Sequence, residues 1–151
     1  MNYIRLRFYN GKGLFSKLIK WRSWGEYSHV DIVMPNYTLI GAIGGKGGVV
    51  LHTSYPAKSY VTYDVPVPNA IEGLGWLVNQ IGKPYDWTAI GAFITRTDWD
   101  DESKWFCSEL ATATLMKAGL PPILGGEPYM ISPNDLLRLI SWAGAKEVKD
   151  D

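Results

Sequence analysis

The sequence predicts an α+β protein in which an antiparallel sheet packs against helices. Short segments with alternating apolar and polar residues dominate the first half of the chain, and turn-forming residues separate them, which is typical of strands. The second half contains segments with a helical spacing of apolar residues and with recognisable helix ends. The resulting order (strand, helix, strands, helices) favours the α+β class.

The first two elements lie at the N-terminus. Ile4, Leu6 and Phe8 alternate with Arg5 and Arg7, and this period of two predicts a half-buried strand. After two glycines we expect a helix, with its lysines facing solvent. Its buried side should consist of Leu14, Phe15, Leu18, Ile19 and Trp21.

The next strands are expected to pair as antiparallel neighbours. Residues 28–34 have strand character, and His29 and Asp31 point to the same side of that strand. A two-residue turn at Pro35-Asn36 leads back into a partner strand over residues 37–43. After a glycine-rich loop, further strands are expected over residues 49–53 and 60–67.

Three helices are expected in the second half. Asn69 and Glu72 form a capping-box-like start for the first helix. The second covers residues 104–118, and Ser132-Pro133 opens the third, with proline at its first helical position. The apolar face of the first of these helices should comprise Ile71, Leu74, Leu77, Val78 and Ile81.

Composition narrows the class of protein. The 151 residues are 46% hydrophobic and 20% charged, which indicates one domain over residues 1–151 with a core of its own. Fifteen basic and fifteen acidic side chains balance, so the chain is not a nucleic-acid-binding polycation. One cysteine and two histidines exclude an internal disulfide and a structural zinc site built of these residues alone. We expect no metal and no other cofactor.

The sequence also bears on location. No apolar run approaches the roughly 20 residues that span a bilayer. Arg5 and Arg7 interrupt the apolar residues near the N-terminus, which therefore lacks a signal-peptide core. We expect synthesis in the cytosol. A cell-wall substrate would then be reached through lysis, a virion or another export route, and a phage origin would fit that.

Cys107 and His29 are the candidate pair for chemistry. Cys107 falls in the first turn of the helix expected over residues 104–118. Free N–H groups and the positive end of the helix dipole favour a thiolate there, and the same N–H groups would hold an oxyanion. His29, on a rigid strand, would supply the imidazole that passes a proton to the leaving group.

Each of these residues also has a purely structural interpretation. A lone cysteine is typically a small buried apolar residue, and its small neighbours Ala111, Thr114 and Ala118 fit tight packing equally well. A lone histidine on a strand is commonly satisfied within the structure. The acidic run from Asp98 to Glu102 would oppose thiolate formation if it lay close, because negative charge disfavours a second anion.

Three segments, in this order, resemble the NlpC-type cysteine hydrolases, which are papain-like cell-wall peptidases. They are Ser28-His29-Val30, the segment from Gly82 to Trp87, and the segment from Phe106 to Leu110. The order histidine before cysteine resembles the circularly permuted branch, which includes YiiX-like and lecithin:retinol acyltransferase-like proteins. Residues 131–136 are similar to the start of that branch's C-terminal helix, and the resemblance covers the chain from about residue 15 to residue 137.

The resemblance implies a papain-like core, with the cysteine helix packed across the sheet that carries the histidine. It implies Cys107 as nucleophile and His29 as general base. It also places Tyr85 near the nucleophile, in contact with substrate or oxyanion, although an ordinary aromatic after a helix end is an equally good interpretation. The implied substrate is an amide, foremost a peptide stem of peptidoglycan. The permuted branch also includes lipid-directed acyl hydrolases and transferases.

The chain departs from the family pattern at the residue that orients the histidine. The family has a polar residue about a dozen positions after the base, one strand over, where this chain has Gly41 or Ala42. Three substitutes exist: Asp31 on the same strand face, Thr38 on the pairing strand if the turn has two residues, and His52 on the following strand. We rank Asp31 first, because a buried carboxylate needs a partner, and we expect His52 to be a partly exposed strand residue.

The leading hypothesis is a thiol-dependent hydrolase that cleaves an amide or ester through an acyl-enzyme. The departure from the family pattern keeps a second hypothesis open: a catalytically weak or inactive binding or structural module, phage- or cell-wall-associated. The basic stretch from Lys12 to Arg22 offers membrane-surface contact, but we favour a core-packed helix with solvated lysines. The run from Asp98 to Glu102 does not match the EF-hand pattern and is expected to be a solvated loop. The oligomeric state stays open.

Overall fold

The computed structural model describes residues 2–87, 104–121 and 131–149. Within them, six strands form one sheet in the order β4-β3-β2-β1-β5-β6, with every neighbouring pair antiparallel. The strands are β1 (Tyr3–Gly11), β2 (His29–Val33), β3 (Leu39–Ile43), β4 (Gly48–His52), β5 (Ala57–Pro66) and β6 (Lys146–Val148). The helices are α1 (Leu14–Ser23), α2 (Ala70–Val78), α4 (Cys107–Lys117) and α5 (Pro133–Trp142), with a 3-10 turn η1 (Gly44–Lys46). The predicted α+β class is confirmed.

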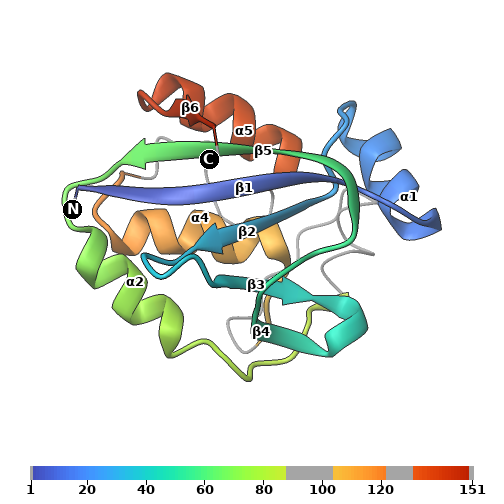
Figure 1. The fold of residues 1–151 in the computed structure, drawn as a ribbon, viewed down its shortest axis with the longest axis horizontal. Coiled ribbons are helices and arrows are strands. Elements are labelled where there is room, and N and C mark those ends of the chain that lie inside the picture. Colours follow the sequence, from blue (N-terminus) through green and yellow to red (C-terminus); the bar gives the residue numbers. More distant parts are fainter. Residues whose placement is uncertain (1, 88–103, 122–130, 150–151) are drawn as a thin grey trace.

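The hydrophobic core lies between one face of the sheet and the helices. Figure 1 shows α4 running behind β1 and β2. The alternation that predicted β1 is confirmed, since its apolar positions enter this core and its arginines do not. Burying each large apolar side chain contributes about 1.5–3 kcal/mol. Fully buried members of this core include Ile4, Leu6, Phe8, Val30, Ile32, Leu110 and Leu115.

β2 and β3 pair only next to the turn that joins them. Their register joins Ile32 to Ile40 and Val33 to Leu39, and from there the two strands diverge, as Figure 1 shows. β1, in contrast, pairs with β2 along all of β2. The start of β2, which carries His29 and Asp31, therefore has strand pairing on the β1 side only.

The turn between β2 and β3 differs from the prediction. The Met34 N–H donates to the carbonyl of Thr38 at 2.8 Å, and three residues lie between them, the last with a φ of 65°. A three-residue loop shifts the register by one position from that of a two-residue turn, which turns Thr38 to the other face of the sheet. Gly41 faces Asp31 instead.

The connection from β4 to β5 crosses the sheet face that points away from α4. β4 is at one edge of the sheet, whereas β5 lies beyond β1, so residues 53–56 pass across β3 and β2 (Figure 1). Tyr55, in this connection, stacks on His29 with ring centroids 4.0 Å apart and an interplanar angle of 13°. The crossing connection thus covers the start of β2.

Helix α1 buries a narrower side than predicted. Ile19 is buried, but Leu18 and Trp21 are exposed. The helix lies at one end of the sheet, where its main contacts are with β1 and α5. A helix at such an end has less protein surface to cover its apolar side chains.

Helix α2 also turns a different side inward. Leu74 and Leu77 are buried as expected, whereas Ile71, Val78 and Ile81 are exposed. Gly73 lies so close to α4 that a β-carbon on it would approach Ala118 within 2.7 Å. A small-residue contact therefore sets the packing, and the helix is rotated away from its most apolar side.

The acidic run from Asp98 to Glu102 lies outside the described residues. In the part of the chain that is described, no helix has both the length and the apolar character that crossing a bilayer requires.

Candidate functional site

Cys107 is the first residue of α4. Phe106 precedes it in an extended conformation, and its N–H donates to the Glu109 carboxylate at 3.3 Å, which stabilises the first helical turn. A parallel bridge joins Trp105 to Tyr85. The start of α4 is therefore fixed beside Tyr85, and the prediction that Cys107 lies in the first turn of its helix is confirmed.

His29 is the first residue of β2, and Asn134 of α5 holds the chain just before it. The Tyr27 N–H donates to Oδ1 of Asn134 at 3.0 Å, and Nδ2 of Asn134 donates to the Tyr27 carbonyl at 2.8 Å and to Oγ of Ser23 at 2.6 Å. A β-carbon at Gly25 would overlap the Asn134 amide. Both backbone groups of Tyr27 are thus paired, which fixes where β2 begins.

The side chains of His29 and Asp31 meet on the same face of β2. Nε2 of His29 lies 2.6 Å from Oδ1 of Asp31, and both side chains are buried. Burial alone would raise the pKa of the Asp31 carboxyl, but the charge and hydrogen bond of His29, aided by His52, hold that pKa well below its usual range. Asp31 is therefore an anion at neutral pH.

His29 also interacts with Cys107. Burial alone would lower the pKa of His29, but the charge and hydrogen bond of Asp31 outweigh it, and a hydrogen bond with the Cys107 side chain adds to the effect. Together they raise the pKa of His29 from 6.5 to about 10. The fold thus brings the two predicted catalytic side chains together although they are far apart in the sequence.

His52 lies on the opposite side of Asp31 from His29. Its Nε2 is 3.0 Å from Oδ2 of Asp31, and its Nδ1 is 3.0 Å from the Ser54 carbonyl. The expectation of a partly exposed residue is wrong, since His52 is only 7% exposed. The β3–β4 register pairs it with Leu39, and this places it on the same face of the sheet as Asp31.

Gly41 occupies the position where the resembled family has its orienting side chain. A β-carbon there would overlap Oδ1 of Asp31 and lie 3.5 Å from Nε2 of His29. The Asp31 carboxylate therefore fills the space that a side chain at position 41 would take. Thr38, the third substitute considered, does not reach this space, because its hydroxyl donates to Oδ1 of Asn36 at 2.6 Å on the exposed turn.

A cavity of about 290 Å³ opens beside His29. Its lining includes Ser16 of α1 and the rings of Tyr55, Tyr85 and Trp87. Burial and the neighbouring Cys107 raise the pKa of Tyr85 well above its usual range. Burial, Cys107 and Asp31 raise that of Tyr55 to about 12. Both phenols are therefore neutral at neutral pH, and both lie close enough to Cys107 for its charge to raise their pKa.

The Cys107 sulfur is not exposed in this cavity. Cys107 is 1% exposed and does not belong to the cavity lining. A larger hollow of about 400 Å³, lined by Tyr3, Met34 and Tyr37 among others, lies at the far end of β1 and β2 and is not lined by His29 or Cys107. Reaction at the sulfur therefore requires a local movement that exposes it.

A solved structure with the same arrangement of elements is the crystal structure of the metalloprotein yiiX from Escherichia coli O157:H7. The match covers 99% of this chain and 97% of that chain, with a TM-score of 0.65 and 18% sequence identity. This chain shares the fold of yiiX. At that identity, the likeness to yiiX shows the fold alone. No protein-family model matches the sequence, and a search of curated proteins finds no match.

The solved structure of yiiX is named a metalloprotein. In this chain, the residues that the structure describes do not form a metal site. Among them, no group of three or more His, Cys, Asp or Glu side chains is arranged to hold one. His29 and His52 both direct Nε2 at the Asp31 carboxylate rather than at a common point between them.

Sequence reasoning missed three residues that build the site. Asn134 clamps the chain before His29, Tyr55 covers the His29 ring, and Gly41 makes room for Asp31. Gly41 left a signal, because it falls at the position where the family pattern has a side chain. Asn134 lies in the segment 131–136 that resembles the family's C-terminal helix start, but its partner Tyr27 is distant along the chain. Nothing local in the sequence marks Tyr55, whose contact depends on the crossing of residues 53–56.

Proposed function

We propose that the protein is a thiol-dependent hydrolase that cleaves an amide or ester bond through an acyl-enzyme. Cys107 is the nucleophile, His29 the general base and Asp31 the residue that positions the imidazole. The observation that carries the proposal is the buried His29 ring, which interacts with Cys107 and is held by Asp31 at 2.6 Å. A nucleophile, a base and an orienting group in contact form the arrangement that acyl transfer requires.

The reaction would proceed in two balanced steps. The Cys107 sulfur, having given its proton to His29, forms a bond to the substrate carbonyl carbon. The bond from that carbon to the leaving amine or alcohol then breaks, and the leaving group takes the proton from His29. Water next attacks the thioester while His29 takes its proton. The bond from the carbonyl carbon to the sulfur then breaks and the acid leaves. His29 returns the proton to the sulfur, which restores the thiol. The N–H groups in the first turn of α4, which have no carbonyl partner within the helix, would stabilise each oxyanion.

The resemblance to cell-wall peptidases favours an amide in a peptidoglycan peptide over an ester. The aromatic lining of the cavity is compatible with either an acyl chain or a sugar-linked peptide. The fold shared with yiiX supports the architecture of the proposal and says nothing of its substrate. Tyr85, next to Cys107, is proposed to contact the substrate or the oxyanion.

A second candidate function is a binding or structural module of the same fold without catalysis. The burial of the Cys107 sulfur is the observation that favours it. This alternative predicts that Cys107→Ser retains full biological activity, whereas the hydrolase predicts that the same substitution abolishes it.

Alkylation of Cys107 by iodoacetamide tests the proposed function without knowledge of the substrate. A thiolate held by an imidazolium reacts at acidic pH, where an ordinary thiol does not. We expect rapid alkylation at about pH 6, and about a hundredfold slower alkylation in His29→Gln.

The chain contains a single cysteine, so the alkylated site is unambiguous. Lys149→Gln, a substitution in the C-terminal tail, serves as the control and should leave the rate unchanged. Slow alkylation of the wild-type protein that does not depend on His29 would refute an activated nucleophile. Release of peptide from peptidoglycan by the wild-type protein, lost in Cys107→Ser, would then identify the substrate class.

A further inference from the structure

We propose that His52 is a positioning residue of the site, which holds the second oxygen of Asp31 so that the first stays on His29. The inference rests on the proposed function and extends it to a residue outside the resembled family's pattern. His52 does not line the cavity beside His29, and its contact with the site runs through Asp31, so we place its action on Asp31.

The hydrogen-bond partners of the His52 ring define its role. Nδ1 lies 3.0 Å from the Ser54 carbonyl, which can only accept, so Nδ1 carries a proton. Nε2 then faces Oδ2 of Asp31 at 3.0 Å. Among the described residues, neither Nε2 of His52 nor Oδ2 of Asp31 makes a well-aligned hydrogen bond, with each other or with any other group, so the 3.0 Å contact is a close approach of the two atoms. A proton on Nε2 would make this contact attractive, because the ring N–H would then face a carboxylate oxygen.

Asp31 needs such an anchor because it is fully buried. A buried carboxylate with one unpaired oxygen is strongly destabilised, and rotation about its terminal bond would take Oδ1 away from His29. His52 pairs with one oxygen and His29 with the other. Gly41 provides the space that the carboxylate needs to face both.

Other titratable and charged groups lie near His29, Asp31 and His52. Tyr9 from β1 and Tyr55 from the crossing connection both have a raised pKa, owing to burial and, in part, to the Asp31 charge. Arg7, also on β1, lies opposite Asp31 in the sheet register. The Asp31 charge therefore acts on groups from β1 and from the crossing connection, and His29 and His52 are its ion-pair partners at 2.6 and 3.0 Å.

Two variants of His52 separate a positioning role from a merely structural one. His52→Leu removes the donor, whereas His52→Gln retains an amide N–H that can reach Asp31. We expect iodoacetamide alkylation of Cys107 at about pH 6 to fall about tenfold or more in His52→Leu. The rate should be restored to within a few-fold of wild type in His52→Gln.

The NMR titration of the His29 ring provides a readout that does not depend on activity. Its midpoint should move in His52→Leu and stay near that of wild type in His52→Gln. Equal rates and equal His29 midpoints in folded wild-type and His52→Leu proteins would overturn the inference. A different result would refute the proposed function: equal alkylation rates of Cys107 in the wild-type protein and in His29→Gln.

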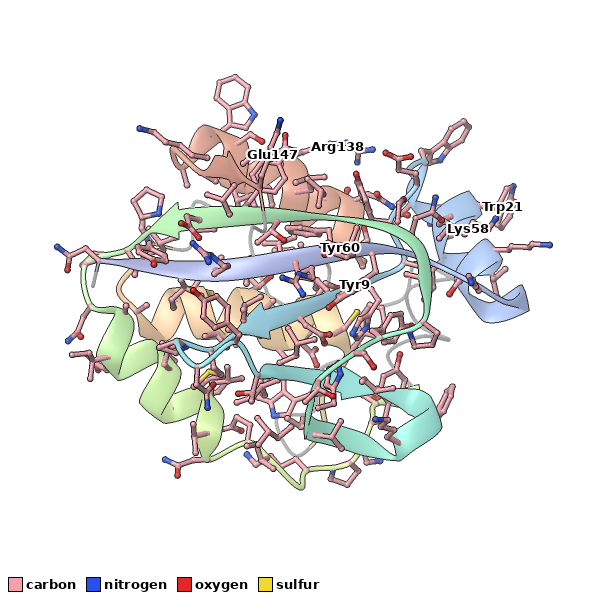
Figure 2. All side chains as sticks on the ribbon, in the orientation of Figure 1. Tyr9, Trp21, Lys58, Tyr60, Arg138 and Glu147 are labelled. Carbon is pink, nitrogen blue, oxygen red and sulfur yellow. The ribbon has the colours of Figure 1, made fainter. Side chains whose placement is uncertain are left out.

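Helix α1 has a second, independent feature, which we call the α1 surface: Lys12, Lys17, Leu18, Trp21, Trp24 and Lys58. Trp21 is 71% and Trp24 84% exposed. Lys17, Leu18 and Trp21 recur at the spacing that keeps them on one side of a helix, and Trp24 follows as the C-terminal cap of α1. Figure 2 shows Trp21 and Lys58 at the same end of the molecule, and the charges of Lys17 and Lys58 act on Lys20. No acidic residue precedes Glu26 in the sequence.

We infer that the α1 surface binds anionic lipid bilayers. Exposed tryptophans are typical of the membrane–water interface, and neighbouring lysines attract anionic headgroups. Charge complementarity favours a lipid surface over a neutral sugar polymer, because a cluster of lysines attracts anionic headgroups and contributes little to the binding of a neutral ligand. Ser16 of the same helix lines the cavity beside His29, so docking would bring the cavity near the bilayer.

Vesicle binding tests this inference on the intact protein. We expect co-sedimentation with phosphatidylserine-containing vesicles at about 0.1 M salt and its loss at about 1 M salt, with no binding to pure phosphatidylcholine. Trp21→Ser with Trp24→Ser, or Lys17→Gln with Lys58→Gln, should reduce binding about tenfold or more. Trp142→Ser, at an equally exposed position (91%) on α5, is the matched control and should bind as wild type. Equal binding by the double variants, or binding to a soluble polyanion as tight as to the vesicles, would refute a bilayer site.

Discussion

At the scale of single residues, the site depends on one carboxylate that is paired on both sides. Asp31 holds His29 at 2.6 Å and is itself held by His52 at 3.0 Å. A neutral amide of the same shape would keep the packing but remove the charge that raises the pKa of His29 to about 10. The imidazolium that stabilises a thiolate would then be lost at neutral pH.

Asp31→Asn should therefore lower the pKa of His29 and slow alkylation of Cys107 by about two orders of magnitude near neutral pH. NMR titration of the His29 ring and iodoacetamide kinetics measure the two effects. Asp64→Asn provides a control, because it neutralises a carboxylate on β5, away from Cys107, that pairs with Arg5 of β1. An unchanged titration of His29 would show that Asp31 does not set its charge.

Gly41→Ala is a second test at this scale. The added β-carbon would overlap Oδ1 of Asp31, so the carboxylate must move away from His29. We expect a loss of Cys107 reactivity of at least about tenfold, with circular dichroism to verify that the protein is folded. Gly75→Ala, in α2 beside open space and outside the cavity lining, should leave the reactivity unchanged, and a similar small effect of both substitutions would contradict the proposed fit.

At the scale of elements, α5 fixes the start of β2. Asn134 uses its amide to pair both backbone groups of Tyr27. Asn134→Ala would leave these groups unpaired in a partly buried position, which costs about 1–3 kcal/mol.

We expect Asn134→Ala to lower the free energy of unfolding by about that amount and to slow alkylation of Cys107, since His29 follows directly. Ser141→Ala, on the exposed side of the same helix, should have little effect on either quantity. Denaturant unfolding and iodoacetamide kinetics measure them. A loss of stability with full reactivity would show that Asn134 does not control the position of His29.

The elements also show what could be predicted from the sequence and what could not. Apolar periodicity predicted β1, and helix signals placed Cys107 at the start of α4, because both depend on local chemistry. The predicted buried sides of α1 and α2 were right for Ile19, Leu74 and Leu77 and wrong for their exposed apolar residues. The contact of Gly73 with Ala118 and the end-of-sheet position of α1, which decide this, depend on distant parts of the chain. The prediction that Thr38 faces His29 was wrong because the turn has one residue more than expected. The extra residue moves every following residue to the opposite face of the sheet.

At the scale of the whole molecule, stability should depend on pH through the buried His29–Asp31 pair. The pKa of His29 is raised from 6.5 to about 10, so between these values the folded state binds a proton that the unfolded state has lost. This contribution is complete below about 6.5 and disappears as the pH rises through about 10. The lowered pKa of Asp31 acts at the other end, and its contribution is lost only in strong acid.

Thermal unfolding followed over this range should show a falling melting temperature between about pH 7 and pH 10. Asp31→Asn should have a lower melting temperature at neutral pH and a flatter profile over the same window. The raised pKa of Tyr9 and of Tyr85 acts in the same direction at the alkaline end. A profile that is identical for both proteins would show that the pair does not contribute to the pH dependence.

The overlap between the Asp31 carboxylate and any side chain at position 41 has a consequence for chains related to this one. The side chains at positions 31 and 41 would occupy the same space. A carboxylate at 31 could therefore be exchanged for a polar side chain at 41 only if both positions changed together. Related chains should therefore divide into two populations, one with a bulky polar group at 41 and a small residue at 31, the other with the reverse. Sequence searches that demand the former would overlook members of the latter.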